Sequence, residues 1–163
     1  MKCFGLIGNP LGHSFSPLIH KHLFGIKNID ASYKLLETTP ENLKKRIDEL
    51  KSGEYDGFNV TIPYKIEIMK YLDEISPEAL AIGSVNTICM KNGKVVGYNT
   101  DYFGFKRELE YYNIKVEKQN AYVLGTGGAS KAITKALENM NANVTLVSRH
   151  PKNNIIGYED LKS

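Results

Sequence analysis

Two residues of this sequence have the chemistry of an acid/base pair. Lys65 closes the polar string Asn-Val-Thr-Ile-Pro-Tyr-Lys (59–65), and Asp101 closes the string Gly-Tyr-Asn-Thr-Asp (97–101). An ammonium group can deliver a proton to a developing alkoxide, and a nearby carboxylate can orient that ammonium group. Apolar segments typical of strands flank both strings, so we expect loops at strand ends to bring the two side chains into one pocket.

Both residues also have an ordinary structural explanation. Most lysines are simply solvated. We predict a helix that carries Ile66, Met69 and Leu72, with Lys65 in its first turn. A cation there opposes the helix dipole, and this small cost favours a functional role for Lys65. An acidic residue in a first helical turn is favourable in itself, so Asp101 alone is weak evidence.

A third polar string, Gly-Asn-Pro-Leu-Gly-His-Ser-Phe-Ser-Pro (8–17), follows a short apolar strand. It places the hydroxyls of Ser14 and Ser16 side by side, and we expect them in the same pocket. Ser16 is also a good N-cap before a proline, and Ser14 could serve only to stabilise the loop. His20 and His22 would face different sides of a helix, so we expect no metal site.

A glycine turn, Gly125-Thr126-Gly127-Gly128, lies between a strand at 121–124 and a helix that begins near Ala129. Gly125 permits a tight turn, Gly127 lets the backbone approach a pyrophosphate, and the helix N-terminus attracts that anion. Ser130 stands where the dinucleotide-binding fingerprint has its third glycine, which weakens the match. A purely structural turn is the alternative.

Arg149 lies in Ser148-Arg149-His150, at the end of the following strand (143–147). A site for NAD places an acidic residue there to bind the ribose 2′-hydroxyl, whereas a cation suits the 2′-phosphate of NADP. The alternative is a solvated arginine at a strand end.

Strands and helices alternate along the chain, which predicts an α/β fold. We expect an N-terminal three-layer α/β substrate domain with a mostly parallel sheet (residues 1–112), followed by a partial Rossmann-type βαβ unit (113–163). Helices are expected from Ser16, from Thr39, at 77–82 and from a Thr100 N-cap; strands at 3–7, 32–37 and 56–61; and a hairpin of 84–90 with 95–98 around Asn92-Gly93.

Composition excludes several classes of function. The chain has 163 residues, 42% hydrophobic and 24% charged, and a net charge of +3 without a run of like charges. This composition predicts a folded, soluble protein without nucleic-acid or membrane partners. Cys3 and Cys89 have no neighbours at metal-ligand spacing, and the N-terminal apolar run is too short for a secretion signal. A cytoplasmic location fits these features.

Five motifs occur in the order found in shikimate dehydrogenases, and the chain closely resembles that family over residues 1 to about 150. They are Gly8-Asn9-Pro10 with His13-Ser14-x-Ser16-Pro17; Asn59-Val60-Thr61-x-Pro63-x-Lys65; Gly83-Ser84-x-Asn86-Thr87; Asn99-Thr100-Asp101-x-x-Gly104; and Gly125-x-Gly127-Gly128-Ala129. Five ordered motifs are far more specific than one glycine turn.

The resemblance implies a reversible, NADP-dependent reduction of 3-dehydroshikimate to shikimate, on the route to chorismate and the aromatic amino acids. Ser14 and Ser16 would hold the substrate carboxylate. Thr61, Asn86, Thr100 and Asp101 would complete the substrate site, with Lys65 as the acid/base. Gly125, Gly127, Gly128 and Ala129 would bind the pyrophosphate and Arg149 the 2′-phosphate of NADP. A monomer or a homodimer is compatible with the sequence.

Two departures from the family leave alternatives open. The usual Asn-Arg-Thr is Ser148-Arg149-His150 in this chain, so only the arginine remains and NAD stays an alternative cofactor. Family members are considerably longer and complete the cofactor sheet, so we expect the chain to be a fragment. A shikimate-binding module without hydride transfer is one alternative, and a dehydrogenase that acts on quinate is another.

Overall fold

The computed structural model of this protein describes residues 1–161, whose contacts form two compact units. Unit 1 comprises Met1–Ala81 and Val85–Tyr98, and unit 2 comprises Ile82–Ser84 and the chain from Asn99 onward. Helix α4 (Asp101–Tyr111) therefore groups with unit 2 and not with the residues before it. The division into a substrate part (1–112) and a dinucleotide part (113–163) stays a functional prediction, and residues 162 and 163 lie outside the described chain.

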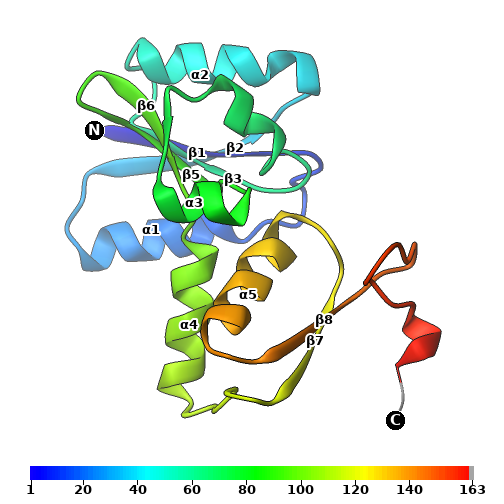
Figure 1. Cartoon of the computed structure of the whole chain (residues 1–163). Helices are drawn as coiled ribbons and strands as arrows, with labels where there is room; N and C mark the ends of the chain where they lie inside the picture. The colour runs from blue at the N-terminus through cyan, green and yellow to red at the C-terminus, as the bar shows by residue number, and fades with distance from the viewer. Residues whose placement is uncertain (162–163) are drawn as a thin grey trace. The chain divides into compact units, whose positions relative to one another are not determined.

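Unit 1 is built on a six-stranded sheet with the order β2-β1-β3-β5-β6-β4 (Figure 1). Strand β1 pairs in parallel with β2 and β3, and β4 pairs in parallel with β6, whereas β5 is antiparallel to both of its neighbours. The strands are β1 (Lys2–Gly8), β2 (Ala31–Glu37), β3 (Gly57–Val60), β4 (Glu74–Ile75), β5 (Thr87–Lys91) and β6 (Lys94–Tyr98). The predicted α/β class with a mostly parallel sheet is confirmed.

The hairpin of β5 and β6 turns at Asn92 and Gly93, as its sequence predicts. Both residues have positive φ, 52° and 76°, and this pair of angles matches the twist of two antiparallel strands. The turn brings an antiparallel pair into a sheet whose first three strands are parallel.

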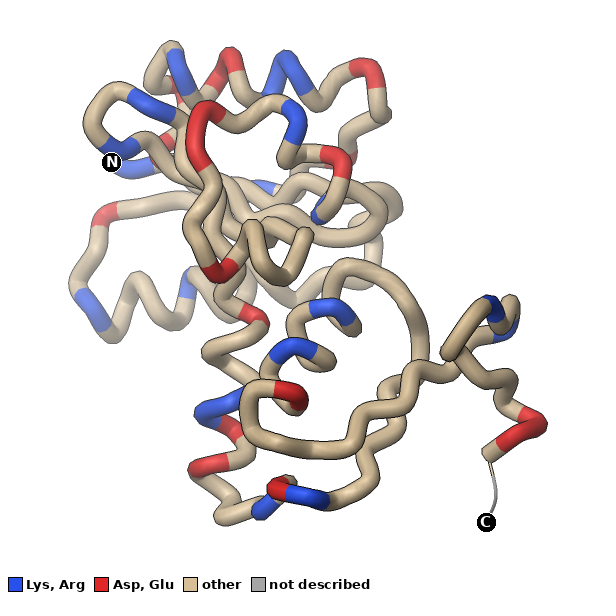
Figure 2. Tube along the Cα trace, viewed as in Figure 1, with Lys and Arg blue, Asp and Glu red and all other residues tan. Residues whose placement is uncertain are grey.

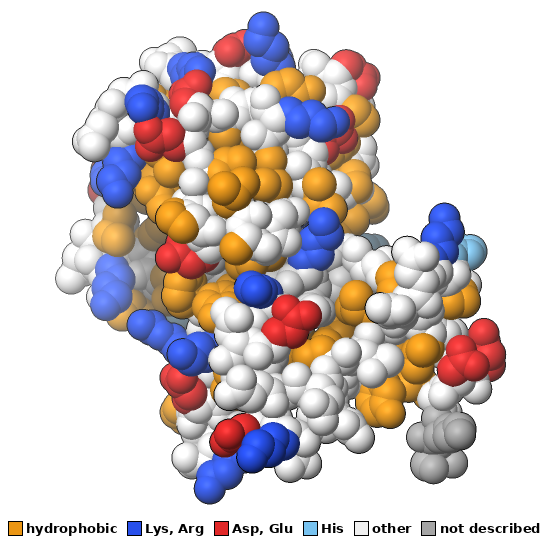
Figure 3. Space-filling model, viewed as in Figure 1, with side chains coloured by type: hydrophobic (Ala, Val, Ile, Leu, Met, Phe, Trp, Pro, Cys, Tyr) orange, Lys and Arg blue, Asp and Glu red, His pale blue; other side chains and the backbone are white. Residues whose placement is uncertain are grey.

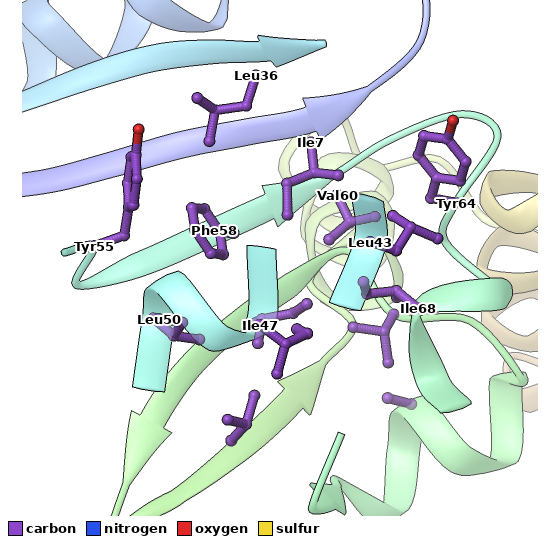
Figure 4. Close-up of a cluster of buried hydrophobic side chains, with 14 residues drawn as sticks. Ile7, Leu36, Leu43, Ile47, Leu50, Tyr55, Phe58, Val60, Tyr64 and Ile68 are labelled. Carbon is purple, nitrogen blue, oxygen red and sulfur yellow. The ribbon is translucent and has the colours of Figure 1, made fainter. Parts of the chain in front are cut away.

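Helices cover both faces of this sheet and make the three expected layers (Figure 1). On one face, α2 (Leu43–Lys51) buries Leu43, Ile47 and Leu50 against Phe58, Ile88 and other core side chains (Figure 4). The 3₁₀ helix η1 (Pro40–Asn42) precedes it, and α3 (Pro77–Ile82) contributes Ala79 to the same core. On the other face, α1 (Ser16–Ile26) packs its Phe24 ring 5.8 Å from that of Phe4.

The helix predicted after Lys65 is wrong in type and in position. A 3₁₀ helix, η2 (Glu67–Tyr71), forms instead, and Leu72 has extended backbone angles. Lys65 lies in a turn before η2, so the helix-dipole argument for its role does not apply. The spacing of Ile66, Met69 and Leu72 suits an α-helix and a 3₁₀ helix alike. In the structure this segment forms the tighter 3₁₀ helix, with Ile68 buried in the unit 1 core.

Unit 2 contains the predicted βαβ unit. Strands β7 (Asn120–Leu124) and β8 (Asn143–Val147) pair in parallel, and α5 (Gly128–Asn139) connects them. Leu109 of α4 packs with Val123 and Leu137 in the core of this unit, which explains why α4 groups with it. The outer edge of β8 takes one parallel bridge, from Val147 to Ile156, and the 3₁₀ helix η3 (Tyr158–Asp160) follows.

Charged side chains of both signs are interspersed along the described chain (Figures 2 and 3). Helix α2 shows the pattern, with Arg46 and Glu49 in an ion pair at 2.8 Å. Within residues 1–161, no helix has the length and apolar character required to cross a membrane.

Candidate functional site

Two loops at the carboxyl ends of β1 and β3 lie side by side in unit 1. The Thr61 amide donates to the Ile7 carbonyl at 2.8 Å, and the Asn9 amide donates to the Ile62 carbonyl at 3.1 Å. Gly8 makes this close approach possible, because a Cβ there would lie 2.5 Å from Cγ2 of Thr61 and 2.7 Å from Cδ2 of Leu11. The loop that carries the two serines and the loop that carries Thr61 are therefore adjacent at this edge of the sheet.

Ser14 and Ser16 are hydrogen-bonded to each other at the end of the loop that follows β1. The Ser14 hydroxyl donates to Oγ of Ser16 at 3.1 Å, and the Ser16 amide donates to Oγ of Ser14 at 3.3 Å. The expected N-cap role of Ser16 is wrong, because Ser16 is the first residue of α1 and Phe15 is the cap. Its hydroxyl therefore does not serve the helix end.

A second series of polar contacts spans strands β2, β3 and β5 of the sheet. The Tyr33 hydroxyl donates to Oδ1 of Asn59 at 2.8 Å. Nδ2 of Asn59 donates to Oγ1 of Thr87 at 3.2 Å, and the Thr87 hydroxyl donates to Oδ1 of Asn86 at 3.1 Å. We call these four residues and the serine pair, Ser14, Ser16, Tyr33, Asn59, Thr87 and Asn86, the polar relay.

Three members of the polar relay were not among the residues predicted from sequence. Asn59 and Thr87 lie inside the quoted motifs, so their place beside Thr61 and Asn86 is a signal that could have found them. Tyr33 lies in a strand outside all five motifs. Only the strand order β2-β1-β3 shows that its hydroxyl reaches Asn59 across β1.

Lys65 is held in place through its backbone and through Tyr64. Tyr64 is 2% exposed, and its hydroxyl donates to the Thr38 carbonyl at 2.5 Å. The Lys65 carbonyl accepts from the Val85 amide at 2.8 Å, one residue before Asn86. A buried anchor on one side and a backbone bond on the other fix where the half-buried Lys65 side chain starts.

A cavity of about 300 Å³ adjoins the polar relay on the α1 face of the sheet. Apolar and aromatic side chains line most of it, including Phe4, Phe24 and Ile88, and Tyr33, Asn59 and Thr87 border it. Ser14, Ser16, Thr61 and Lys65 are not part of its lining. The predicted substrate residues of unit 1 therefore do not line this cavity.

Asp101 and Thr100 belong to unit 2, at the start of α4. Asn99 supplies the side-chain acceptor there, because its Oδ1 accepts from the Tyr102 amide at 3.2 Å and its Nδ2 donates to the Ser84 carbonyl at 2.9 Å. Thr100 is the N-cap residue of α4, as predicted, and the side-chain hydrogen bond to the first turn comes from Asn99, one residue earlier. The pairing of Asp101 with Lys65, a residue of unit 1, stays a prediction.

The glycine turn of unit 2 has the geometry that an anion site needs. Gly125 has φ of +108°, a conformation that side chains rarely adopt, and an added Cβ at Gly127 would find no atom within 4 Å. Helix α5 then begins at Gly128. Ser130 turns its hydroxyl back to the Gly127 carbonyl at 2.7 Å and is 8% exposed, so a serine fits where the fingerprint has glycine.

Arg149 is exposed two residues beyond β8. The Ser148 amide donates to the Ile156 carbonyl at 2.9 Å, and the His150 amide donates to Oγ of Ser148 at 3.1 Å. These bonds hold the backbone on both sides of Arg149 and leave its guanidinium group at the surface. Residues 1–161 contain no group of three or more side chains suited to hold a metal ion.

Comparison with known proteins identifies the family. Residues 6–88 match the family model described as the shikimate dehydrogenase substrate binding domain. The chain belongs to the shikimate dehydrogenase family. The match includes every member of the polar relay, together with Thr61 and Lys65.

Named relatives agree with this assignment. A shikimate dehydrogenase (NADP(+)) of Clostridium perfringens is 49% identical over 150 residues, which are 91% of this chain and 55% of the relative. A crystal structure of shikimate dehydrogenase 1 from Peptoclostridium difficile superposes with a TM-score of 0.90 at 45% identity, covering 98% of this chain and 62% of that one.

A Thermus thermophilus shikimate 5-dehydrogenase in complex with NADP(H) and shikimate has a TM-score of 0.86 at 32% identity, covering 96% of this chain and 62% of that one. The chain spans about half the length of the curated relatives it matches.

Proposed function

We propose that this chain supplies the substrate-binding part and the first portion of the cofactor-binding part of an NADP-dependent shikimate dehydrogenase. The reaction is the reversible reduction of 3-dehydroshikimate to shikimate. The polar relay is the observation that carries this proposal. It places hydroxyl and amide groups next to each other at the strand ends of unit 1, where a small polyhydroxylated acid needs several donors and acceptors.

In this proposal the substrate meets two groups of residues. The hydroxyl groups of Ser14 and Ser16 donate hydrogen bonds to the substrate carboxylate. Thr61, Asn86, Thr100 and Asp101 bind the ring hydroxyls. The hydrogen bond between Ser14 and Ser16 supports the first assignment, because it places two hydroxyls 3.1 Å apart, a spacing suited to the two oxygens of one carboxylate.

Lys65 is proposed as the acid/base. When NADPH supplies hydride to the ketone carbon, negative charge develops on the ketone oxygen, and the Lys65 ammonium stabilises that charge and donates a proton to the oxygen. Asp101 is proposed to orient the ammonium group. In the reverse direction Lys65, as the neutral amine, accepts the hydroxyl proton.

The glycine turn of unit 2 fits the pyrophosphate of NADP. Open space at Gly127, the tight turn at Gly125 and the first amides of α5 leave room and donors for an anion, with Gly128 and Ala129 in the first helical turn. Arg149, exposed beyond β8, is proposed to bind the 2′-phosphate.

We further propose that the protein acts in the cytoplasm, which the two free cysteines, Cys3 and Cys89, support. We also propose that it works as a monomer or a homodimer.

Reduction of NADP in the presence of shikimate tests the proposal. An increase in absorbance at the reduced-nicotinamide band supports the dehydrogenase. Binding of shikimate without any such increase supports the second candidate, a shikimate-binding module.

The choice of substrate and cofactor is tested in the same assay. Rates with shikimate and quinate, each with NADP and NAD, separate the proposed enzyme from a quinate-active or NAD-dependent relative. We expect NADP with shikimate to give the highest rate, and replacement of Arg149 by alanine to lower the preference for NADP.

A further inference from the structure

Asn99 is a buried residue to which the proposed function gives no role. It follows β6 and precedes Thr100, the N-cap residue of α4, and it is 2% exposed. Burial of an amide is unfavourable unless its polar atoms have hydrogen-bond partners. The two polar atoms of the Asn99 side chain are bonded to two different segments of unit 2.

One of these bonds supports the start of α4, and the other reaches a distant segment. Oδ1 of Asn99 accepts from the Tyr102 amide at 3.2 Å, and Nδ2 donates to the Ser84 carbonyl at 2.9 Å. Serine and aspartate serve as well as asparagine as acceptors for the first amides of a helix, so the first bond does not require an amide side chain. The second bond does, because the amide carries a donor nitrogen in addition to its acceptor oxygen.

The bond to Ser84 connects the two stretches of chain that lead to residues of the proposed substrate site. Asn86 follows Ser84 by two residues, and Asp101 follows Asn99 by two residues. The Asn86 amide donates to the Tyr98 carbonyl at 3.0 Å, so the same two stretches are also bonded through their backbones. The Asn99 side chain extends this connection to the residues that begin α4.

We propose that Asn99 is a positioning residue for Thr100 and Asp101. It acts through its bond to the Ser84 carbonyl and binds no ligand itself. The proposal rests on the proposed function, in which Thr100 and Asp101 bind ring hydroxyls of the substrate. Hydrogen bonds weaken steeply as their geometry departs from the optimum, so residues that bind a ring hydroxyl need a fixed backbone.

Two variants separate the two bonds of Asn99. Asn99→Ser and Asn99→Asp each keep an oxygen that accepts from the Tyr102 amide, but neither has the nitrogen that donates to the Ser84 carbonyl. Serine is smaller and uncharged, whereas aspartate keeps the shape and adds a charge, so the two variants share the lost bond and differ in their other effects. We expect unchanged hydrogen exchange at the Tyr102 amide in both, because the start of α4 keeps its acceptor.

The test is an NMR titration of the full 163-residue chain with two ligands, shikimate and cyclohexene-1-carboxylate, which has the carboxylate but no ring hydroxyls. Loss of one hydrogen bond predicts roughly fivefold weaker shikimate binding in each variant. Cyclohexene-1-carboxylate binding should not change, because Ser14 and Ser16 hold the carboxylate in the proposed function. This second ligand is also an anion, so it controls for the charge added by Asn99→Asp.

Ser84→Ala is the matched control. The Ser84 side chain is fully buried, and its hydroxyl has no hydrogen-bond partner among the described residues. Alanine leaves the Ser84 carbonyl in place as the acceptor of the Asn99 bond. Shikimate affinity should therefore stay at the wild-type value.

The outcomes distinguish the role of Asn99 from the proposed function. Wild-type shikimate affinity in the Asn99 variants, or equal losses for the two ligands, would overturn the positioning role alone. A loss in Ser84→Ala as large as that in Asn99→Ser would assign the effect to local packing and would also overturn it. A wild-type chain that binds neither ligand would refute substrate binding by this chain, and the role of Asn99 with it.

Discussion

At the scale of single residues, contacts with neighbouring segments fix the backbone of Lys65, which does not belong to a helix. Its carbonyl bonds the Val85 amide, and its neighbour Tyr64 is locked to Thr38. A lysine in so constrained a turn starts from one backbone position. This constraint replaces the helix-dipole argument as the structural support for its proposed role.

Replacement of Lys65 by alanine tests that role. We expect most NADP reduction with shikimate to be lost, since proton transfer by a positioned group commonly contributes about 10²- to 10⁴-fold in rate. Shikimate affinity should stay within about tenfold, because other side chains make most of the contacts. Initial rates and a binding titration measure the two effects. Lys91→Ala, at an exposed lysine of the β5–β6 hairpin, is the control, and a near-normal rate for Lys65→Ala would contradict the assignment.

Tyr33 also predicts a pH dependence of stability. Its folded-state pKa is raised to about 12 by burial, above the ordinary value of 10.0. As pH rises, the unfolded chain therefore loses the Tyr33 proton before the folded chain does. The contribution of the protonated Tyr33 to the free energy of unfolding is fully present below pH 10 and is lost between pH 10 and 12. Chemical denaturation at pH 9, 10 and 11 in wild type and Tyr33→Phe measures the difference.

We expect the variant to lose less stability than the wild type over that range. Burial also raises the pKa of Tyr55, so part of the alkaline loss should remain in Tyr33→Phe. Parallel curves for the two proteins would show that the Tyr33 hydroxyl is solvated in solution.

At the scale of elements, the two glycines of the unit 2 turn have different tasks. Gly125 has a positive φ that other residues adopt only with strain. Gly127 has φ of −79° and ψ of −175°, which any residue adopts, and its surroundings are open. The first glycine thus serves the chain, and the second leaves space for a ligand.

This difference predicts that replacement by alanine lowers stability at Gly125 and weakens NADP binding at Gly127. Gly125→Ala should destabilise the protein by about 1 to 3 kcal/mol, the usual cost of such a strained backbone. Gly127→Ala should change the free energy of unfolding by less than about 0.5 kcal/mol, as surface substitutions do, but should weaken NADP binding. Urea denaturation and a cofactor titration measure the two quantities. Equal destabilisation by both variants would argue against the assigned tasks.

At the scale of the whole molecule, the two faces of the unit 1 sheet are covered to different degrees. The α2 face holds a core of fully buried side chains such as Leu43 and Ile68 (Figure 4). The α1 face retains the 300 Å³ cavity, and the apolar residues of α1 are largely exposed: Leu18 at 66%, Ile19 at 54% and Ile26 at 61%. An exposed apolar stripe of this kind attracts other apolar surfaces.

We expect the isolated chain to bind hydrophobic dyes and to self-associate through this stripe. The double variant Leu18→Lys, Ile26→Lys should show lower dye fluorescence and a lower average mass in sedimentation. Its melting temperature should change little, because neither side chain is buried. Leu80→Lys, at an equally exposed leucine of α3 (63%), is the control and should have a smaller effect. Unchanged association in the double variant would exclude the α1 stripe as its cause.

The sequence by itself determined the features that depend on neighbours along the chain. The hairpin at Asn92-Gly93, the glycine turn before α5, the βαβ unit and the buried face of α2 all follow from local propensity and short-range spacing. The ordered motifs determined the family. They also identified Ser14 and Ser16, which the structure joins through hydrogen bonds, and Asn86, which accepts a hydrogen bond from Thr87.

Only the tertiary structure decided what depends on residues far apart in sequence. Side-chain periodicity says which residues share a face of one strand but not which strand lies next to it, so the place of Tyr33 beside Asn59 needed the order β2-β1-β3. The same holds for α4, whose Leu109 packs with unit 2, and for the segment after Lys65, where core packing goes with a 3₁₀ helix. In each case, contacts between distant segments outweigh the preferences of the local sequence.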